Sequence, residues 1–484
     1  HDTTRVLLGI HPEWFDWKLE PGEEFQTPEA VMVYTDRGMN DMSQTFHRLY
    51  QKRLARGYWR DRERPILINN WEATYFDFNE DKLLKLAKTA KNAGIELFVL
   101  DDGWFGKRCS DQAGLGDWKA NPERLPQGIP GLAAKIENLG MKFGLWFEPE
   151  MVNKDSDLYR EHPDWILSVP ERNQCHGRNQ HVLDFSRKEV VDRIYEMMAE
   201  ILKSGAVSYI KWDMNRSITE CWSPALPADR QGEVFHRYIL GVYDLYERLT
   251  SEFPKVLFES CASGGARFDP GILYYAPQGW TSDDTDAVER LKIQYGTSYC
   301  YPTSSIGAHV SASPNHQVNR STPLSTRANV ACFGTFGYEL DLNRMTDQEL
   351  AQVKEQVDFM KTWRKLLQFG KFYRLVSPFE GNIGAWMTVS ENQNEAIVGW
   401  YRILNTPNPP YTRLRLAGLD PEQLYQVSED GEVLGEFYGD ELMYVGIITS
   451  DGNFGSSSHA KKSRCDFESR LFVITGKTDS GSEK

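Results

Sequence analysis

The chain has 484 residues, 40% of them apolar and 26% charged, which is enough for two or three globular domains. A net charge of −14 argues against nucleic acids and anionic membranes as partners, and no apolar run is long enough to cross a membrane. Seven cysteines without a C-x-x-C pair argue against a zinc site or a disulfide framework and favour a reducing, cytoplasmic location.

The first 60 residues combine a β-like stretch near the start with an amphipathic stretch at 41–58. We expect this region to be the end of a preceding domain followed by a linker helix. The chain begins with His1 and shows no signal peptide.

Residues 61–375 alternate between short apolar runs and amphipathic stretches. Helices are predicted at 79–94, 186–205 and 232–253, the second with a capping box formed by Ser186 and Glu189. The apolar runs lie at 65–72, 95–106, 142–151, 207–215, 256–265, 277–284, 300–309 and 330–340. Eight strands separated by helices predict an α/β protein with a (β/α)8 TIM barrel. The alternative, a doubly wound open sheet, would normally have a Gly-rich loop after its first strand, and none is present here.

Residues 376–475 change to short alternating strands and predict a small all-β sandwich domain. The stretch 383–403 has the pattern of a hairpin, and 468–475 that of a last strand. The Ser- and Gly-rich region 449–464 is expected to be a loose loop, and 476–484 a disordered tail.

The apolar runs of the barrel region end in polar residues. In "SYIKWDMNR", residues 208–216, the side chains of Lys211, Asp213 and Asn215 share one face of a strand. Strand ends of a TIM barrel meet at one mouth, where active sites lie. The candidate carboxylates there are Asp101, Asp102, Glu148, Glu150, Asp213, Glu259, Asp283 and Asp284. Such a set suits glycoside hydrolysis by paired carboxyl groups, with Mg²⁺ binding as the competing interpretation. A lysine beside Asp213 argues against a metal, and we predict no metal and no cofactor.

At this level of detail the sequence resembles the microbial α-galactosidases of glycoside hydrolase family 36, in clan D. The resemblance covers about 65–345 and rests on Trp71 and on the motifs "LDDGWFG" (100–106), "GDWKAN" (116–121), "GLWFEPEM" (144–151), "HPDW" (162–165), "GRNQHVLDFSR" (177–187), "YIKWDMNR" (209–216), "ESCASGGARFD" (259–269) and "WTSDDTD" (280–286).

The resemblance implies a retaining exo-α-galactosidase that removes terminal α-linked galactose from oligosaccharides of the melibiose, raffinose and stachyose type. Asp213 would be the nucleophile and Asp283 the acid/base of a double displacement. The implied substrate-binding residues are Trp71, Asp101, Asp102, Trp146, Arg178, Lys211, Asn215, Cys261 and Gly264.

Elementary electrostatics fits these roles. We expect Lys211 to favour the ionised form of Asp213, and the carboxyl groups of Asp213 and Asp283 to lie roughly 5–5.5 Å apart, as retention requires. Two competing interpretations are that Asp213 is a structural partner of Lys211 and that Asp283 caps the following helix.

Other activities remain open on the sequence alone. The same fold could serve an α-N-acetylgalactosaminidase or an α-galactosyl transglycosylase, Lys211 could form a Schiff base in a lyase, or the protein could bind sugars without turnover. The family usually carries a large N-terminal β-sandwich, of which only a remnant is expected here. A homo-oligomer, a tetramer in longer relatives, is therefore possible but doubtful, and the expected partner is a small α-galactoside.

Overall fold

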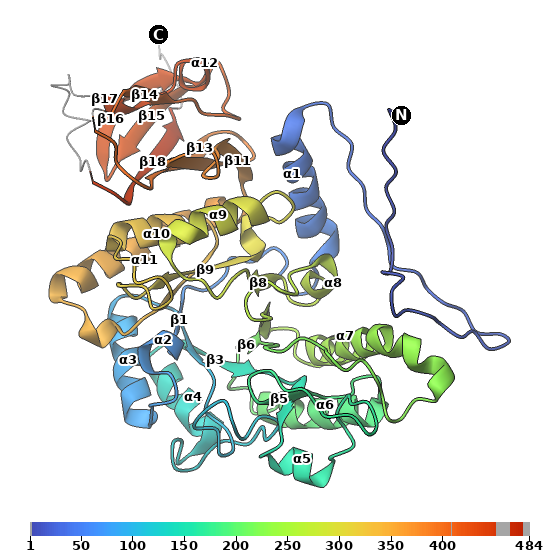
Figure 1. Cartoon of the computed structure of the whole chain (residues 1–484). Helices are drawn as coiled ribbons and strands as arrows, with labels where there is room; N and C mark the ends of the chain where they lie inside the picture. Colours follow the sequence, from blue (N-terminus) through green and yellow to red (C-terminus); the bar gives the residue numbers. More distant parts are fainter. Residues whose placement is uncertain (1, 408, 452–464, 478–484) are drawn as a thin grey trace.

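The structure is a computed structural model that describes residues 2–407, 409–451 and 465–477. Eight parallel strands form a closed barrel in the order β1-β10-β9-β8-β7-β6-β3-β2 (Figure 1). Seven of the predicted apolar runs each contain one of these strands, and the run 300–309 overlaps the eighth, which confirms the TIM barrel. The strands are β1 (Leu67–Asn69), β2 (Leu97–Leu100), β3 (Lys142–Phe147), β6 (Tyr209–Trp212), β7 (Leu257–Ser260), β8 (Gln278–Trp280), β9 (Ile306–Ser311) and β10 (Thr335–Glu339).

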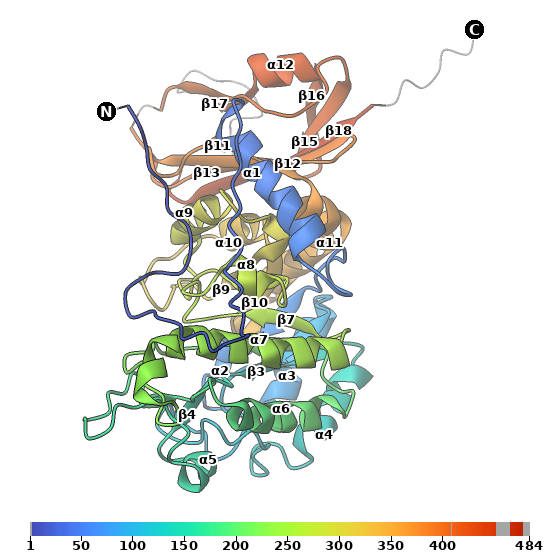
Figure 2. The ribbon, with the colours of Figure 1, turned by 90° about the vertical axis from the view of Figure 1, so that its right-hand side faces the viewer.

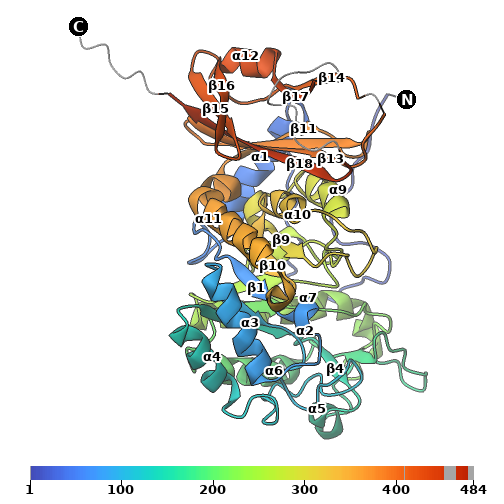
Figure 3. The same cartoon turned by 90° about the vertical axis from the view of Figure 1, so that its left-hand side faces the viewer.

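Helices cover the outside of the barrel, with α3, α4 and α11 visible along one side in Figure 3. The long ones are α3 (Glu80–Asn92), α4 (Gly128–Asn138), α6 (Lys188–Leu202), α7 (Val234–Glu252), α9 (Ala287–Thr297), α10 (Leu324–Ala331) and α11 (Asp347–Phe369). Short helices α2 (Trp71–Thr74), α5 (Asp157–Glu161) and α8 (Pro270–Leu273) and a two-stranded sheet of β4 (Met151–Asn153) and β5 (Gln180–Val182) occupy the loops.

The N-terminal ends of two helices show how far capping residues could be predicted from the sequence. Asn79 caps α3 by accepting the backbone N–H of Lys82 at 3.0 Å. The capping box predicted for α6 is wrong, because this helix begins after Arg187, which makes no side-chain cap. The hydroxyl of Ser186 donates instead to Asp184, which lies before the helix.

Strand β6 shows how the alternation of side chains divides the barrel interior from its outer layer. Tyr209 points inward and belongs to a small apolar cluster with Leu67, Leu97 and Leu257, which come from other barrel strands. Trp212 points outward and stacks on Tyr246 of α7, with ring centroids 3.9 Å apart. Lys211 therefore points inward, above the apolar layer, as the sequence pattern predicted.

The N-terminal region begins as an extended segment that runs beside the barrel before α1 (Gly38–Leu49) and a π-helical turn, Tyr50–Leu54 (Figure 2). The stretch near residue 6 that had a β-like pattern forms no strand here. Phe15, Trp17 and Phe25 gather around His236 of α7 and fix the middle of the segment.

The C-terminal region is all-β, as predicted. A six-stranded antiparallel sheet has the order β11-β12-β13-β18-β15-β16, and β14 pairs with β17. The hairpin predicted at 383–403 is β12 and β13. Strand β18 extends through Gly476, so the predicted tail begins one residue too early, and the rest of that tail and most of the predicted loop (452–464) lie outside the described residues. The elements are β11 (Lys371–Val376), β12 (Ile383–Val389), β13 (Glu395–Arg402), β14 (Tyr411–Leu414), β15 (Leu424–Glu429), β16 (Glu432–Tyr438), α12 (Gly439–Tyr444), β17 (Ile447–Asp451) and β18 (Glu468–Gly476).

Across the described parts of the chain, no helix combines the length and apolarity needed to cross a membrane.

Candidate active site

The carboxyl ends of the barrel strands bring the predicted site residues to one mouth. Trp71 follows β1 at the start of α2, Trp146 lies in β3, and Arg178 precedes β5. The others follow or end barrel strands: Asp101 and Asp102 after β2, Lys211, Asp213 and Asn215 at β6, Cys261 and Gly264 after β7, and Asp283 after β8. The topology thus places these residues around a single opening.

Asp213 is 7% exposed and is held by hydrogen bonds. Its Oδ2 accepts the indole N–H of Trp146 at 3.1 Å and the Nδ2–H of Asn215 at 2.7 Å. Its Oδ1 accepts the backbone N–H of Met214 at 2.9 Å. Donors to both oxygens fix the direction of the carboxyl group, as a nucleophile needs.

Lys211 forms its direct ion pair with Asp101. Its Nζ lies 3.3 Å from Oδ2 of Asp101, which also accepts Nδ2–H of Asn69 at 2.6 Å. Burial lowers the pKa of Lys211, but the charges of Asp101 and Glu339 outweigh it and raise the pKa well above its usual value. Asp213 contributes less to this rise, and the expectation that Lys211 favours the ionised form of Asp213 stays a prediction. A permanently charged amine also disfavours the Schiff-base alternative.

Asp283 has the environment of an acid. Burial of its carboxyl group and then the negative charge of Asp213 raise its pKa, while Lys211 partly opposes the rise. Its Oδ1 accepts the indole N–H of Trp280 at 3.1 Å. The cap of α9 is Asp286, which accepts the N–H groups of the first helical turn. Asp283 is therefore free of the capping role, and the two carboxyl groups that interact here have unlike surroundings.

Gly264 has a role in the backbone of this site. It adopts a φ of +84°, and a Cβ there would lie 2.6 Å from the backbone N of Asp283 and from Cα of Ser282. The loop after β7 consequently packs directly against the segment that carries Asp283. A side chain at position 264 would displace that segment.

Arg108 is a residue of this site that sequence reasoning missed. Its guanidinium donates to both oxygens of Asp102, with Nη2 to Oδ2 at 2.8 Å and Nε to Oδ1 at 2.9 Å, and to Oδ1 of Asn153 at 3.1 Å. The side chain of Arg108 is 1% exposed, so this bidentate ion pair is shielded from solvent. Burial raises the pKa of Asp102, and Arg108 counteracts that rise. The available signal was its place six residues after Asp102, the last residue of the LDD motif.

Removal of one partner from a buried pair leaves an uncompensated charge. We expect Arg108→Met to lower the free energy of unfolding by about 3–5 kcal/mol, and Arg108→Met with Asp102→Asn to recover a large part of that loss. Denaturant unfolding measures both. Arg160→Met is the matched control, because Arg160 pairs with Asp155 and Asp157 at the exposed surface and should matter little. Equal stability of Arg108→Met and Arg160→Met would contradict the assignment.

Glu148 supports the proposed nucleophile, Asp213, indirectly, because it holds Asn215. Its Oε1 accepts the backbone N–H of Asn215, and its Oε2 accepts Nε2–H of Gln180 at 3.0 Å. Burial and the charge of Asp213 raise the pKa of Glu148 to about 8. The sequence placed Glu148 among the strand-end carboxylates, but only the structure shows that it holds the residue whose amide group binds Asp213.

Trp71 and Arg178 stand at the outer part of the mouth. Trp71 is half-buried and lies edge-to-face with Tyr75, with ring centroids 5.3 Å apart. Arg178 is exposed, and its charge opposes the rise in the pKa values of Asp102 and Glu148. Cys261 is buried, and this burial, together with the charge of Asp213, raises the pKa of its thiol.

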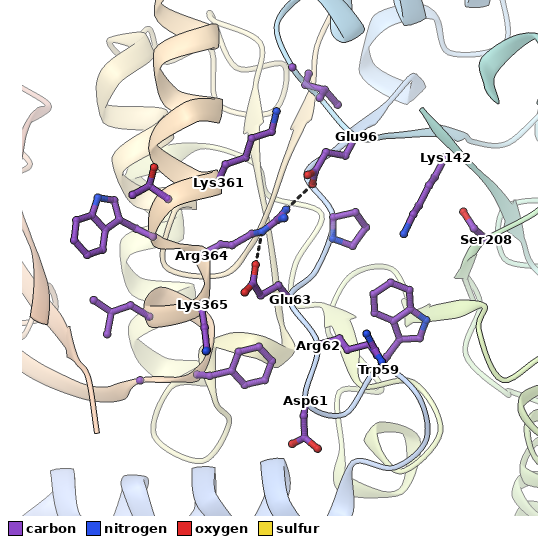
Figure 4. A pocket seen from close by; sticks show the side chains of 18 of the residues that line it. Trp59, Asp61, Arg62, Glu63, Glu96, Lys142, Ser208, Lys361, Arg364 and Lys365 are labelled. Carbon is purple, nitrogen blue, oxygen red and sulfur yellow. Dashed lines mark hydrogen bonds and ion pairs between the residues drawn. The ribbon is translucent and has the colours of Figure 1, made fainter. Parts of the chain in front are cut away.

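A separate cavity of about 1490 Å³ lies at the opposite end of the barrel (Figure 4). Its lining includes Glu96 and Lys142, at the amino ends of β2 and β3, and Arg364 of α11, whose guanidinium donates to Glu63 and Glu96. The barrel core separates it from Asp213 and Asp283, so it does not belong to this site. Within residues 2–407, 409–451 and 465–477, no three His, Cys, Asp or Glu side chains are arranged to hold a metal ion.

Comparison with known proteins agrees with this geometry. The family model described as Melibiase matches residues 24–370, and the model of the glycosyl hydrolase family 36 C-terminal domain matches 383–474. Alpha-galactosidase AgaA of Geobacillus stearothermophilus is 59% identical over 445 residues, which are 92% of this chain and 60% of the relative. Alpha-galactosidase Mel36A of Lactobacillus acidophilus is 53% identical over 442 residues, 91% of this chain and 60% of the relative.

Solved structures give the same result. Crystal structures of AgaA variants in complex with raffinose and with stachyose superpose on this chain with a TM-score of 0.92 and 56% identity. Each covers 97% of this chain, whereas this chain covers 63% of the AgaA chain. This chain thus spans about three fifths of the length of the curated relatives that it matches. The extent of the family match and the identity to these relatives together show that the chain belongs to the Melibiase family, glycoside hydrolase family 36.

Proposed function

We propose that this protein is a retaining exo-α-galactosidase that removes terminal α-linked galactose from oligosaccharides of the raffinose and stachyose type. The observation that carries the proposal is the pair of carboxyl groups at one mouth. Asp213 accepts hydrogen bonds on both oxygens, whereas Asp283 is kept more readily protonated by burial and by the charge of Asp213. Two carboxyl groups with such different surroundings suit a nucleophile and an acid/base.

The relatives support the assignment of these two residues. The AgaA variants crystallised with raffinose and with stachyose each carry a substituted aspartate, and the two substituted positions are separated by the same number of residues as Asp213 and Asp283. Substitution of a catalytic residue is a common way to keep a substrate intact in a crystal. The separation of roughly 5–5.5 Å between the two carboxyl groups, which retention requires, stays a prediction.

The reaction would follow two steps. Asp283 donates its proton to the glycosidic oxygen while Asp213 attacks the anomeric carbon, so the bond to the leaving group breaks and a β-galactosyl ester of Asp213 forms. Water, deprotonated by the Asp283 carboxylate, then attacks the same carbon and releases α-galactose. Asp101, Asp102 and Lys211 are almost fully buried at the mouth and would bind the galactose hydroxyl groups.

The direct test is hydrolysis of raffinose and p-nitrophenyl α-galactoside by the wild-type chain, followed by ¹H NMR. We expect α-galactose as the first product, before mutarotation. The p-nitrophenyl α-N-acetylgalactosaminide serves as the control that separates the alternative sugar specificity. First release of β-galactose, or turnover of only the N-acetyl substrate, would overturn the proposal.

A further inference from the structure

The loop after β9, residues 312–320, crosses the rim of the mouth, and we call it the β9 loop. Asn315 is its buried anchor. The Nδ2–H of Asn315 donates to Oγ1 of Thr285 at 3.0 Å, and its Oδ1 accepts the backbone N–H of Gln317 at 2.9 Å. Thr285 in turn donates to Oε1 of Glu72 at 2.9 Å. The loop is therefore fixed both to the segment of Asp283 and to the segment after β1.

Two consecutive residues of the β9 loop are exposed at this rim. The Nε2–H of Gln317 donates to the main-chain carbonyl of Asp283 at 2.7 Å, so its side chain lies beside the proposed acid/base. His316 has a 41% exposed side chain, and its Nδ1 lies 3.5 Å from Oε1 of Glu72. Among the described residues, none donates a hydrogen bond to the amide oxygen of Gln317 or contacts Nε2 of His316. Both side chains can thus bind a further polar group.

The proposed reaction determines which part of the substrate lies beside His316 and Gln317. Asp283 gives its proton to the glycosidic oxygen, so the leaving group is bonded to an atom in contact with Asp283. Asp101, Asp102 and Lys211 are almost fully buried, whereas Asp283 keeps exposed surface although its carboxyl group is partly desolvated. The leaving group must therefore extend outward past Asp283, along the rim where the β9 loop stands.

We infer that the β9 loop forms the subsite for the leaving-group sugar, with His316 and Gln317 as its hydrogen-bonding side chains. This inference rests on the proposed function. An amide and an imidazole suit a neutral, hydroxyl-rich hexose ring, because each offers a donor or acceptor without requiring a charge. Tyr75 is 42% exposed in the segment of Glu72 and provides an aromatic face on the same side.

The test compares two substrates that differ only in the leaving group. Raffinose has a sugar on the leaving side, and α-galactosyl fluoride has none. We expect the double variant His316→Ala/Gln317→Ala to lower the ratio of kcat/KM for raffinose to kcat/KM for the fluoride by about tenfold, the loss expected for two hydrogen bonds. Val318→Ala is the matched control, because this neighbouring side chain is 40% exposed and cannot bond a hydroxyl group.

The outcomes separate the possible causes. A lowered ratio in the double variant with an unchanged ratio in Val318→Ala supports the subsite. If both substrates lose rate equally, His316 and Gln317 only position Asp283, and the inference is wrong. If Val318→Ala lowers the ratio as much, the loop shape matters instead of its polar groups, and the inference is again wrong. A wild-type chain that hydrolyses neither substrate would instead overturn the proposed function.

Discussion

Asp213→Ala is expected to lower kcat/KM for p-nitrophenyl α-galactoside by about 10⁴-fold or more, the scale seen when a covalent nucleophile is removed. No other described carboxylate has the position of Asp213, between the indole of Trp146 and the amide of Asn215. The alanine also leaves space beside the anomeric carbon. Added azide should enter that space, attack the α-galactoside directly, and give β-galactosyl azide. Kinetics and NMR of the product check both expectations.

Asp192→Ala is the control for this variant. Asp192 lies on the outer face of α6, where it pairs with Lys188 and Arg248, and its removal should leave the rate close to wild type. Full activity of Asp213→Ala, or an azide product of α configuration, would show that Asp213 is not the nucleophile.

Asp283→Ala is expected to lose about 10²–10⁴-fold in kcat/KM on raffinose, because the loss of a general acid matters most for a poor leaving group. The loss should be far smaller on 2,4-dinitrophenyl α-galactoside, whose leaving group departs without a proton. Azide should then intercept the galactosyl–Asp213 ester and give α-galactosyl azide, the opposite anomer from that of Asp213→Ala. Asp284→Asn is the comparison, since Asp284 accepts the backbone N–H of Asp286 at 3.0 Å and serves the turn.

The pH profile gives a second measure of the same residue. Asp283 acts in its protonated form in the first step, and burial together with the charge of Asp213 raises its pKa. The rate of the first step should therefore be highest below that raised pKa and fall as the pH rises through it. This fall is expected for raffinose, whose leaving group needs a proton, and should disappear for the same substrate in Asp283→Ala. An unchanged decline in the variant would assign it to another group.

The sequence by itself determined the barrel and the candidate catalytic carboxylates at its mouth. Eight apolar runs separated by helical stretches predict a parallel barrel because burial on both faces of a strand requires a continuous apolar run. Their polar ends mark the mouth for the same reason, since charged groups are stable there and costly elsewhere. Asp213 and Asp283 were therefore visible as candidates in "YIKWDMNR" and "WTSDDTD", and the alternation along β6 correctly placed Lys211 inside.

Only the tertiary structure decided which of these groups touch. Lys211 and Asp213 are two residues apart in sequence, yet Lys211 pairs with Asp101, which follows β2, because only β3 separates β2 from β6 in the closed barrel. In the same way, Arg108 neutralises Asp102, and Gln317 reaches Asp283 from a different loop. Hydrogen-bond partners depend on distances of a few ångströms between segments far apart in the chain, and no local pattern of residues encodes such distances.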